Sequence, residues 1–165
     1  MTKPLDCGDC SMCCKIPNIP RAEGDVIFNP DREDGAKLEG EWCQHCRPGK
    51  GGCSVYEDRG PTCREYKCVW LQSQDRGEGA MPLSMRPDKS KVMLQPTKGG
   101  YGMIFRVLPE NWGAWQKGGV KRLLLGLWEK DLVAFAADTN GRRAALTPAA
   151  QEMVLKITDE LEDEA

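Results

Sequence analysis

The sequence predicts an α+β protein in which a loop-rich N-terminal region with a cysteine cluster packs on a small ββαββα C-terminal half. Three observations support this fold class. All nine cysteines lie in the first 68 residues of the 165-residue chain. The same stretch is rich in glycine, proline and aspartate and has little hydrophobic periodicity, which is typical of loops. After about residue 80, strand-like and helix-like periodicities alternate instead. We expect region 1–71 to bind metal and region 72–165 to supply packing, within one compact domain.

Two hairpins are predicted in the C-terminal half. Residues 91–97 (KVMLQPT) and 101–109 (YGMIFRVLP) are β-rich and are joined by a Lys-Gly-Gly turn. Residues 131–138 (DLVAFAAD) and 142–146 (RRAAL) flank a Thr-Asn-Gly turn in the same way. Tyr101, Met103 and Phe105 alternate along the first hairpin, so we expect these side chains to face a core.

Two helices complete the ββαββα pattern. The first is predicted from apolar residues at helical spacing and is weakened by the Gly118–Gly119 pair; these apolar residues are Trp112, Trp115, Val120, Leu123, Leu124, Leu127 and Trp128. We expect the three tryptophans to form core or oligomer contacts. The second helix is predicted to begin with Thr147 as N-cap and Pro148 at the first helical position. Its apolar face would consist of Ala150, Val154, Ile157 and Leu161.

Composition and charge argue against several classes of partner. The net charge of −2 does not favour nucleic acid or an anionic membrane. Residues 98–105 (KGGYGMIF) differ by one glycine from an RNA-stacking strand motif, but the charge and the order of the strands disagree with that domain. There is no apolar segment of a secretory signal, and the longest apolar run, residues 123–128, is too short to span a bilayer. We therefore expect a soluble, cytoplasmic protein.

The cysteines have the spacing of metal ligands. The pattern is C-x2-C-x2-C-C, then C-x2-C, a single cysteine, and C-x4-C. Two intervening residues let both thiolates point into one small space from a tight turn, as in zinc knuckles and iron–sulfur loops. The predicted metal ligands are Cys7, Cys10, Cys13, Cys14, Cys43, Cys46, Cys53, Cys63 and Cys68. The expected cofactor is an iron–sulfur cluster or zinc, with iron–sulfur slightly favoured.

Several alternatives stay open at this stage. In a reducing compartment, nine thiols favour metal over disulfides or redox-sensing thiols. Nine cysteines exceed the four that one tetrahedral zinc or one [4Fe–4S] cluster requires, which favours two sites or a polynuclear cluster. A single four-thiolate site with several structural cysteines is the simpler alternative. Because Cys13 and Cys14 are adjacent, Cys14 would reach a second metal or pack as a small buried thiol.

Polar residues near the cysteines are candidates for tuning such a site. Positive charge lowers the pKa of a thiol and offsets the charge of thiolates, although these residues also fit ordinary surface charge. The basic residues near a cysteine are Lys15, Arg47, Lys50, Arg59, Arg64 and Lys67. His45, the only histidine, lies between Cys43 and Cys46, and we expect it to be exposed or outside the ligand set.

The run CGDCSMCC at residues 7–14, with the downstream stretch from Trp42 to Leu71, resembles the CxxCxxCC (YkgJ-type) cysteine cluster family of bacteria and archaea, described as putative zinc- or iron-chelating proteins. The positions that match the downstream family pattern are Gly52, Cys53, Val55, Tyr56, Arg59, Cys63, Arg64, Tyr66 and Cys68. One departure is Gly60, where the family usually has proline. The resemblance implies metal chelation and leaves the metal open. Flagellin lysine methylases carry a related cluster, but the chain contains no glycine-rich cofactor loop, so that activity is not carried over.

Three functions compete on these grounds. The leading expectation is a metal-binding or iron–sulfur protein for electron transfer or for redox or metal sensing, with metal ions and a protein as partners. A zinc-stabilised interaction module is the alternative if the metal is zinc, because four thiolates leave no open coordination position. A metalloenzyme with a reactive surplus cysteine is a further alternative, for which Arg59 or Arg64 would bind an anionic substrate. No nucleophile–base pair is evident, so the chain does not settle whether it is an enzyme.

Overall fold

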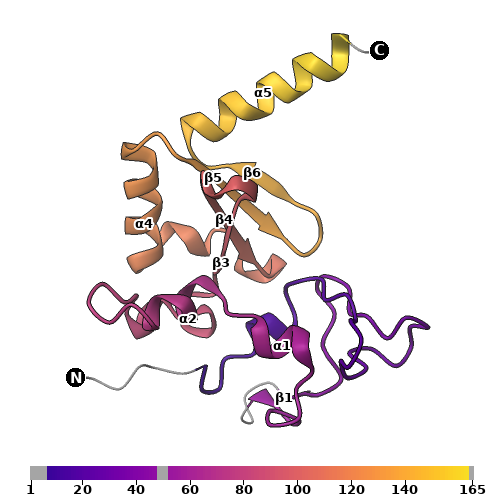
Figure 1. Cartoon of the computed structure of the whole chain (residues 1–165). Helices are drawn as coiled ribbons and strands as arrows, with labels where there is room; N and C mark the ends of the chain where they lie inside the picture. Colours follow the sequence, from indigo (N-terminus) through magenta and orange to yellow (C-terminus); the bar gives the residue numbers. More distant parts are fainter. Residues whose placement is uncertain (1–6, 48–51, 164–165) are drawn as a thin grey trace.

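A four-stranded mixed sheet organises the C-terminal half of the computed structural model, which describes residues 7–47 and 52–163, with side chains as far as Lys156 (Figure 1). Its strand order is β3 (Met93–Pro96), β4 (Gly102–Val107), β5 (Val133–Asp138) and β6 (Arg143–Ala145). The β3–β4 and β5–β6 pairs are antiparallel, which confirms both predicted hairpins. The β4–β5 pair is parallel and joins the two hairpins into one sheet.

The helix α4 (Gly118–Glu129) connects the two hairpins and covers one face of the sheet. Parallel neighbours need such a crossover connection. The core on this face lies between the sheet, α4, and the helix α2 (Val69–Gln74). Its buried members are Trp70, Met85, Val92, Leu94, Phe105, Val107, Trp115, Val120, Ala134 and Ala136. This core therefore joins the sheet and α4 to the segment before β3 that carries Trp70 and Met85.

The expectation of a helix reaching back to Trp112 is wrong. The chain forms two short 3₁₀ turns, η4 (Pro109–Asn111) and η5 (Ala114–Gln116), before α4 begins at Gly118. Gly118 has φ +55°, a left-handed conformation that interrupts a right-handed helix. Trp115 is buried, whereas Trp128 at the far end of α4 is 51% exposed and is not part of the core.

Tyr101 is also placed differently from the expectation. It follows the turn η3 (Lys98–Gly100), precedes the first residue of β4, and is 74% exposed. Met103 and Phe105 do face the core, as expected. The alternation therefore holds only within the strand itself.

The C-terminal helix α5 (Pro148–Asp163) begins as predicted. The Thr147 hydroxyl accepts a hydrogen bond from the Ala150 amide (3.3 Å) and donates one to the Leu132 carbonyl (2.9 Å), which ties the helix start to β5. Ala150 is fully buried and Val154 is 46% exposed, so only Ala150 is buried in the described part of the predicted apolar face. The side chains of Ile157 and Leu161 lie outside the described residues. Figure 1 shows α5 extending away from the sheet.

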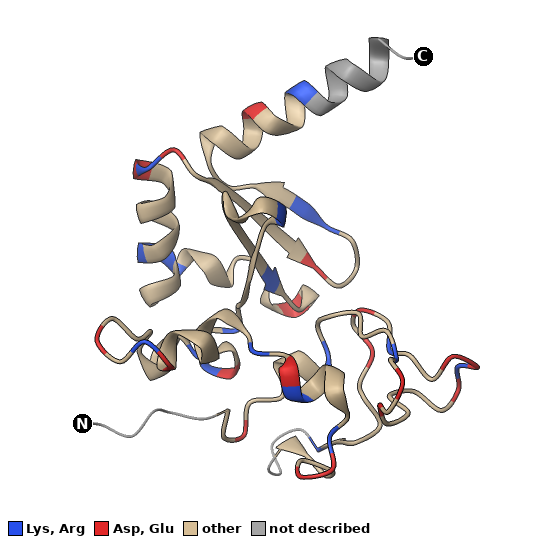
Figure 2. Ribbon diagram, in the orientation of Figure 1, with Lys and Arg blue, Asp and Glu red and all other residues tan. Residues whose placement is uncertain are grey.

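The N-terminal region consists mostly of loops, as expected, with short elements between them. These are η1 (Met12–Cys14), β1 (Cys46–Arg47), β2 (Gly52–Cys53), α1 (Pro61–Glu65), α2, η2 (Leu83–Met85) and α3 (Pro87–Ser90). The strands β1 and β2 pair antiparallel. Charges of both signs are spread along these loops (Figure 2).

Direct contacts join the two halves. Met12 and Ile16 pack with Met93 and Leu108 in a second buried cluster, which also contacts Cys10, Cys13 and Cys68. Arg106 of β4 forms an ion pair with Glu39 from the N-terminal loops. Since Phe105 faces the helical core, its neighbour Arg106 points to the other side of the sheet. The cysteine loops therefore pack against the face of the sheet opposite to the one that α2 and α4 cover.

No helix in the described parts of the chain is long and apolar enough to cross a membrane.

Candidate metal centre

Eight of the nine cysteines line one cavity of about 570 Å³. They come from separate parts of the N-terminal region: the start of the described chain, η1, a loop, β2, α1 and the residue before α2. The lining cysteines are Cys7, Cys10, Cys13, Cys14, Cys43, Cys53, Cys63 and Cys68. All nine cysteines are free thiols. The fold thus collects cysteines as far as 61 positions apart (68 − 7) around one space.

Two of the predicted C-x2-C turns have the geometry that the spacing suggests. The Cys10 amide donates to the Cys7 carbonyl (2.9 Å), and the Cys46 amide donates to the Cys43 carbonyl (2.9 Å). An i to i+3 hydrogen bond of this kind defines a tight turn. The loop is also held to η1, because the Cys43 amide donates to the Cys14 carbonyl (3.0 Å).

Cys46 is the one cysteine that does not line the cavity. It lies in β1 directly opposite Cys53 in β2, and its thiol hydrogen-bonds with Cys14 and Ser11. Cys46 therefore contacts two lining cysteines, Cys14 and Cys53, without lining the cavity itself.

The thiols surround the cavity without closing on one point. Within residues 7–47 and 52–163, no group of three or more His, Cys, Asp or Glu side chains is arranged so that it could hold one metal ion. Apolar side chains complete the wall, among them Ile19, Val26, Phe28, Leu71 and Met93.

Cys13 differs from the other lining cysteines because its pKa is lowered and its charge affects the pKa of several neighbouring thiols. The Cys14 thiol donates a hydrogen bond to Cys13, and this bond is the main cause that lowers the pKa of Cys13. The Cys13 backbone amide and the charges of Arg59 and Lys37 lower it further, whereas burial opposes them. The pKa of Cys14 is correspondingly raised, chiefly by the same hydrogen bond. Cys13 is therefore the thiol most ready to become a thiolate, which is the form that binds metal.

Burial favours the protonated form of several other lining thiols. Together with the negative charge of Cys13, burial raises the pKa of Cys7, Cys10 and Cys63 to about 11. A cation in the cavity would reverse this effect, because metal binding displaces protons from thiols.

A buried lysine lies close to the cavity. Lys37 is fully buried, and the three N–H donors of its ammonium group are shared among four backbone carbonyls, those of Lys15 (2.9 Å), Pro17 (2.6 Å), Leu38 (2.9 Å) and Glu41 (3.0 Å). Burial lowers the pKa of Lys37, while Cys14, Cys43, Glu41 and Cys13 raise it. A charge held in this way offsets negative charge on the neighbouring thiolates.

Arg59 is the cation on the cavity wall with the clearest effect on the thiols. Its guanidinium stacks on the Tyr56 ring at 3.5 Å, its Nε donates to the Tyr56 carbonyl (2.7 Å), and its charge lowers the pKa of Cys7 and Cys13.

Other basic residues named from the sequence have local partners. Arg64 donates to the Glu57 carbonyl (2.9 Å), Lys67 pairs with Asp75 (2.8 Å), and Lys15 lies over the Trp42 ring at 5.0 Å. Arg47 is exposed, and Lys50 lies outside the described residues. His45 is half-buried and lines the cavity, so of the two expected placements the fully exposed one is not observed.

A buried carboxylate fixes the helix that carries Cys63. Asp25 is 5% exposed and accepts hydrogen bonds from the Thr62 amide (3.0 Å), the Thr62 hydroxyl (2.5 Å) and the Ala22 amide (2.9 Å). Burial alone would raise the pKa of Asp25, but these hydrogen bonds outweigh it and lower the pKa. The loop at residues 21–25 therefore holds the N-terminus of α1 and, with it, Cys63.

Sequence reasoning missed both Lys37 and Asp25. Neither lies within two residues of a cysteine, and charged residues are usually exposed. No family model matches the chain, and comparisons with curated proteins and with solved structures give no match either.

Proposed function

We propose that the chain binds a polynuclear metal–thiolate centre in the cysteine cavity, with iron–sulfur favoured over zinc. The observation that carries this proposal is the convergence of eight cysteines on one cavity of about 570 Å³. Four thiolates complete one tetrahedral zinc or one [4Fe–4S] cluster, so eight exceed the needs of either. An iron–sulfur centre also brings its own bridging sulfide and so occupies more space than a bare ion.

The surrounding residues fit a centre with net negative charge. Cys13 would be the first ligand, because it is the thiol with the lowered pKa, and the other lining cysteines would lose their protons as metal enters. Lys37 and Arg59 would offset the charge of the thiolates. When bound, an iron–sulfur centre supplies one-electron transfer or a sensing reaction.

Metal binding would also stabilise the N-terminal fold. That region has few regular elements, and its buried apolar residues near the cavity are few. A metal that joins distant cysteines would hold these loops together and contribute its binding free energy to folding. Since such thiols must stay reduced to bind metal, we further propose a cytoplasmic location.

The test is anaerobic purification followed by visible absorption, metal analysis and determination of acid-labile sulfide. The proposal predicts a brown protein with iron and sulfide. A colourless protein with zinc at two or more equivalents would keep the polynuclear centre and replace electron transfer by a structural role. A protein with neither metal, whose nine thiols all react freely with a thiol reagent, would overturn the proposal.

A further inference from the structure

A second cavity, of about 680 Å³, lies between α3 and the start of α4, and its lining is basic. Its lining residues include the cations Lys89, Lys91, Lys117 and Arg122 and one acid, Glu110. Lys89 also forms an ion pair with Asp88 (3.7 Å), which is not part of the lining. The whole chain has a net charge of −2, so the overall composition does not account for this local excess of positive charge. Figure 2 shows basic residues both at the start of α4 and in the segment that leads into β3. The volume is in the range of small-molecule sites, about 300–1,000 Å³.

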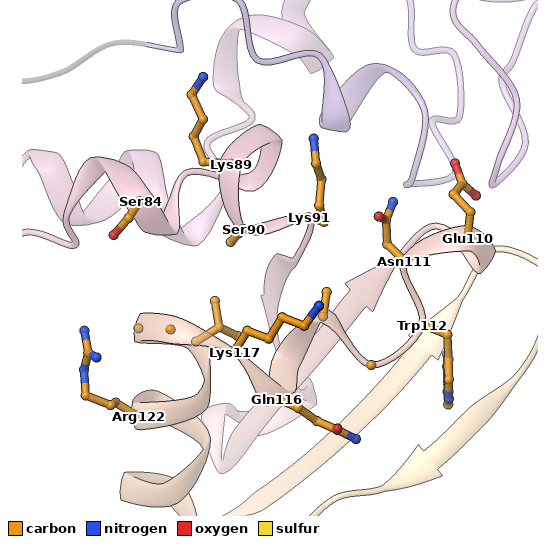
Figure 3. Close-up of a pocket in the computed structure, with 15 residues that line it drawn as sticks. Ser84, Lys89, Ser90, Lys91, Glu110, Asn111, Trp112, Gln116, Lys117 and Arg122 are labelled. Carbon is orange, nitrogen blue, oxygen red and sulfur yellow. The ribbon is translucent and has the colours of Figure 1, made fainter.

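The four cations come from two sides of the cavity. In Figure 3, Lys89 and Lys91 lie on and just after α3, and their side chains extend away from Lys117 and Arg122, which lie at the start of α4. The Lys117 side chain extends between the Ser90–Lys91 segment and the turn that carries Trp112. Lys117 and Arg122 form no ion pair within the described residues. Their charges therefore remain available to an anion.

The start of α4 adds to the positive potential. Its N-cap, Lys117, makes no side-chain capping hydrogen bond, and the first turn contains no acidic residue. A helix N-terminus is the positive end of the helix dipole and normally favours negative side chains, so a lysine there is unfavourable. At Gly118 an added Cβ would meet nothing within 4 Å, so the backbone there is open to a ligand.

Lys91 occupies a position where the backbone favours glycine. It follows α3 with φ +63°, in the left-handed region that lysine rarely adopts. Its ammonium group donates to the Asp88 carbonyl (2.6 Å) and so caps the end of α3. Lys91 also lines the cavity, where its charge adds to the positive potential.

We propose that this cavity binds a small molecule that carries a phosphate group. Lysine contacts phosphate as a point charge, and a tetrahedral anion accepts hydrogen bonds from several directions, which suits Lys117, Arg122 and the amide groups at the start of α4. A carboxylate is better matched by a bidentate arginine, and the lining contains three lysines and one arginine. The proposal does not depend on a metal in the cysteine cavity.

The two cavities share a wall. Pro87 lines the cysteine cavity, while Lys89 and Ser90 line the basic one, and all three belong to α3. The Asp88 backbone also hydrogen-bonds to Cys10. A phosphate ligand in the second cavity would therefore bind one short helix away from a predicted metal ligand.

Calorimetric titration of the full chain with pyrophosphate at low salt tests the proposal. We expect saturable binding that weakens by at least about tenfold in the K117Q/R122Q double variant. The matched control is K121Q, which removes a lysine from the same helix outside the cavity and should change affinity by less than about twofold. Absence of binding, or equal weakening by K121Q and the double variant, would overturn the proposal.

A second variant keeps the test valid if the double variant unfolds. Lys91→Gly removes one cation and also relieves the left-handed backbone, so it should be at least as stable as the parent chain and still bind pyrophosphate about threefold more weakly. Unchanged affinity in a folded Lys91→Gly variant would count against the site. Citrate is the second ligand tested, and binding as tight as that of pyrophosphate would overturn the assignment to phosphate.

Discussion

Gly60 and Asp25 are in such close contact that no side chain fits at position 60. An added Cβ would lie 2.5 Å from the Asp25 Cα and 2.2 Å from its Oδ1. The backbone at Gly60 is extended, with φ −66°, so the glycine is required by space and not by conformation. The contact therefore excludes every residue with a Cβ, proline included, from position 60. It also places the Asp25 carboxylate at the start of α1, next to Cys63.

Gly60→Ala should therefore lower the free energy of unfolding by about 2 kcal/mol, the typical effect of overpacking a tight contact. Urea denaturation of the metal-loaded protein measures this change. Gly126→Ala is the control, because a Cβ at Gly126 in α4 meets nothing within 4 Å and should stabilise the helix by up to about 1 kcal/mol. Equal stability of the parent and the Gly60→Ala variant would show that the Asp25 contact is looser than described.

Asp25 should make stability depend on pH in the acid range. Its pKa in the folded state is lowered by the Thr62 and Ala22 hydrogen bonds despite burial. A carboxylate of this kind contributes stability above its unfolded pKa of about 3.9, and this stability is lost as the pH falls toward the folded pKa. Asp25→Asn should be less stable than the parent at neutral pH and lose less stability below about pH 4. Parallel pH profiles of the two proteins would contradict this account.

Lys37→Met should destabilise the protein by about 3 kcal/mol, because four buried carbonyl groups would lose their donor. Thermal or urea denaturation measures the loss. Lys98→Met, at an exposed position in a turn, is the control and should change stability by less than about 0.5 kcal/mol. A Lys37→Met variant as stable as this control would mean that water replaces the ammonium group.

Cysteine variants should differ according to their place around the cavity. Cys13→Ser removes the thiol with the lowered pKa and should reduce metal content by at least about half, since metal binding needs the thiolate form. Cys46→Ser removes a thiol outside the lining and should retain most of the metal. Metal analysis after identical anaerobic purification makes the comparison. Greater metal loss in Cys46→Ser than in Cys13→Ser would place the centre elsewhere.

The sequence predicted the tight turns of two C-x2-C pairs and the two hairpins, because both features depend on local signals. Spacing shows which thiols share a turn, as the Cys7–Cys10 and Cys43–Cys46 hydrogen bonds confirm. Alternating apolar residues and turn motifs likewise predicted the hairpins. Periodicity does not specify which strand pairs with which, so the parallel β4–β5 pair could not be inferred.

The two main errors of the sequence prediction have causes that the residue pattern does not show. The helix predicted from Trp112 fails because Gly118 takes a left-handed conformation that apolar spacing does not reveal. Lys37 was missed because its burial depends on carbonyl groups from Lys15 to Glu41 that converge only in the folded chain. In both cases the residue types allow the observed backbone without requiring it.

X-ray absorption at the edge of the bound metal tests the central claim most directly. If the cysteines around the cavity hold one polynuclear centre, the spectrum will show sulfur in the first coordination shell, with distances of about 2.3 Å, and scattering from a second metal atom. The Cys13→Ser variant should lose part of both signals. A first shell dominated by nitrogen and oxygen, or a sulfur shell without metal–metal scattering, would contradict the account.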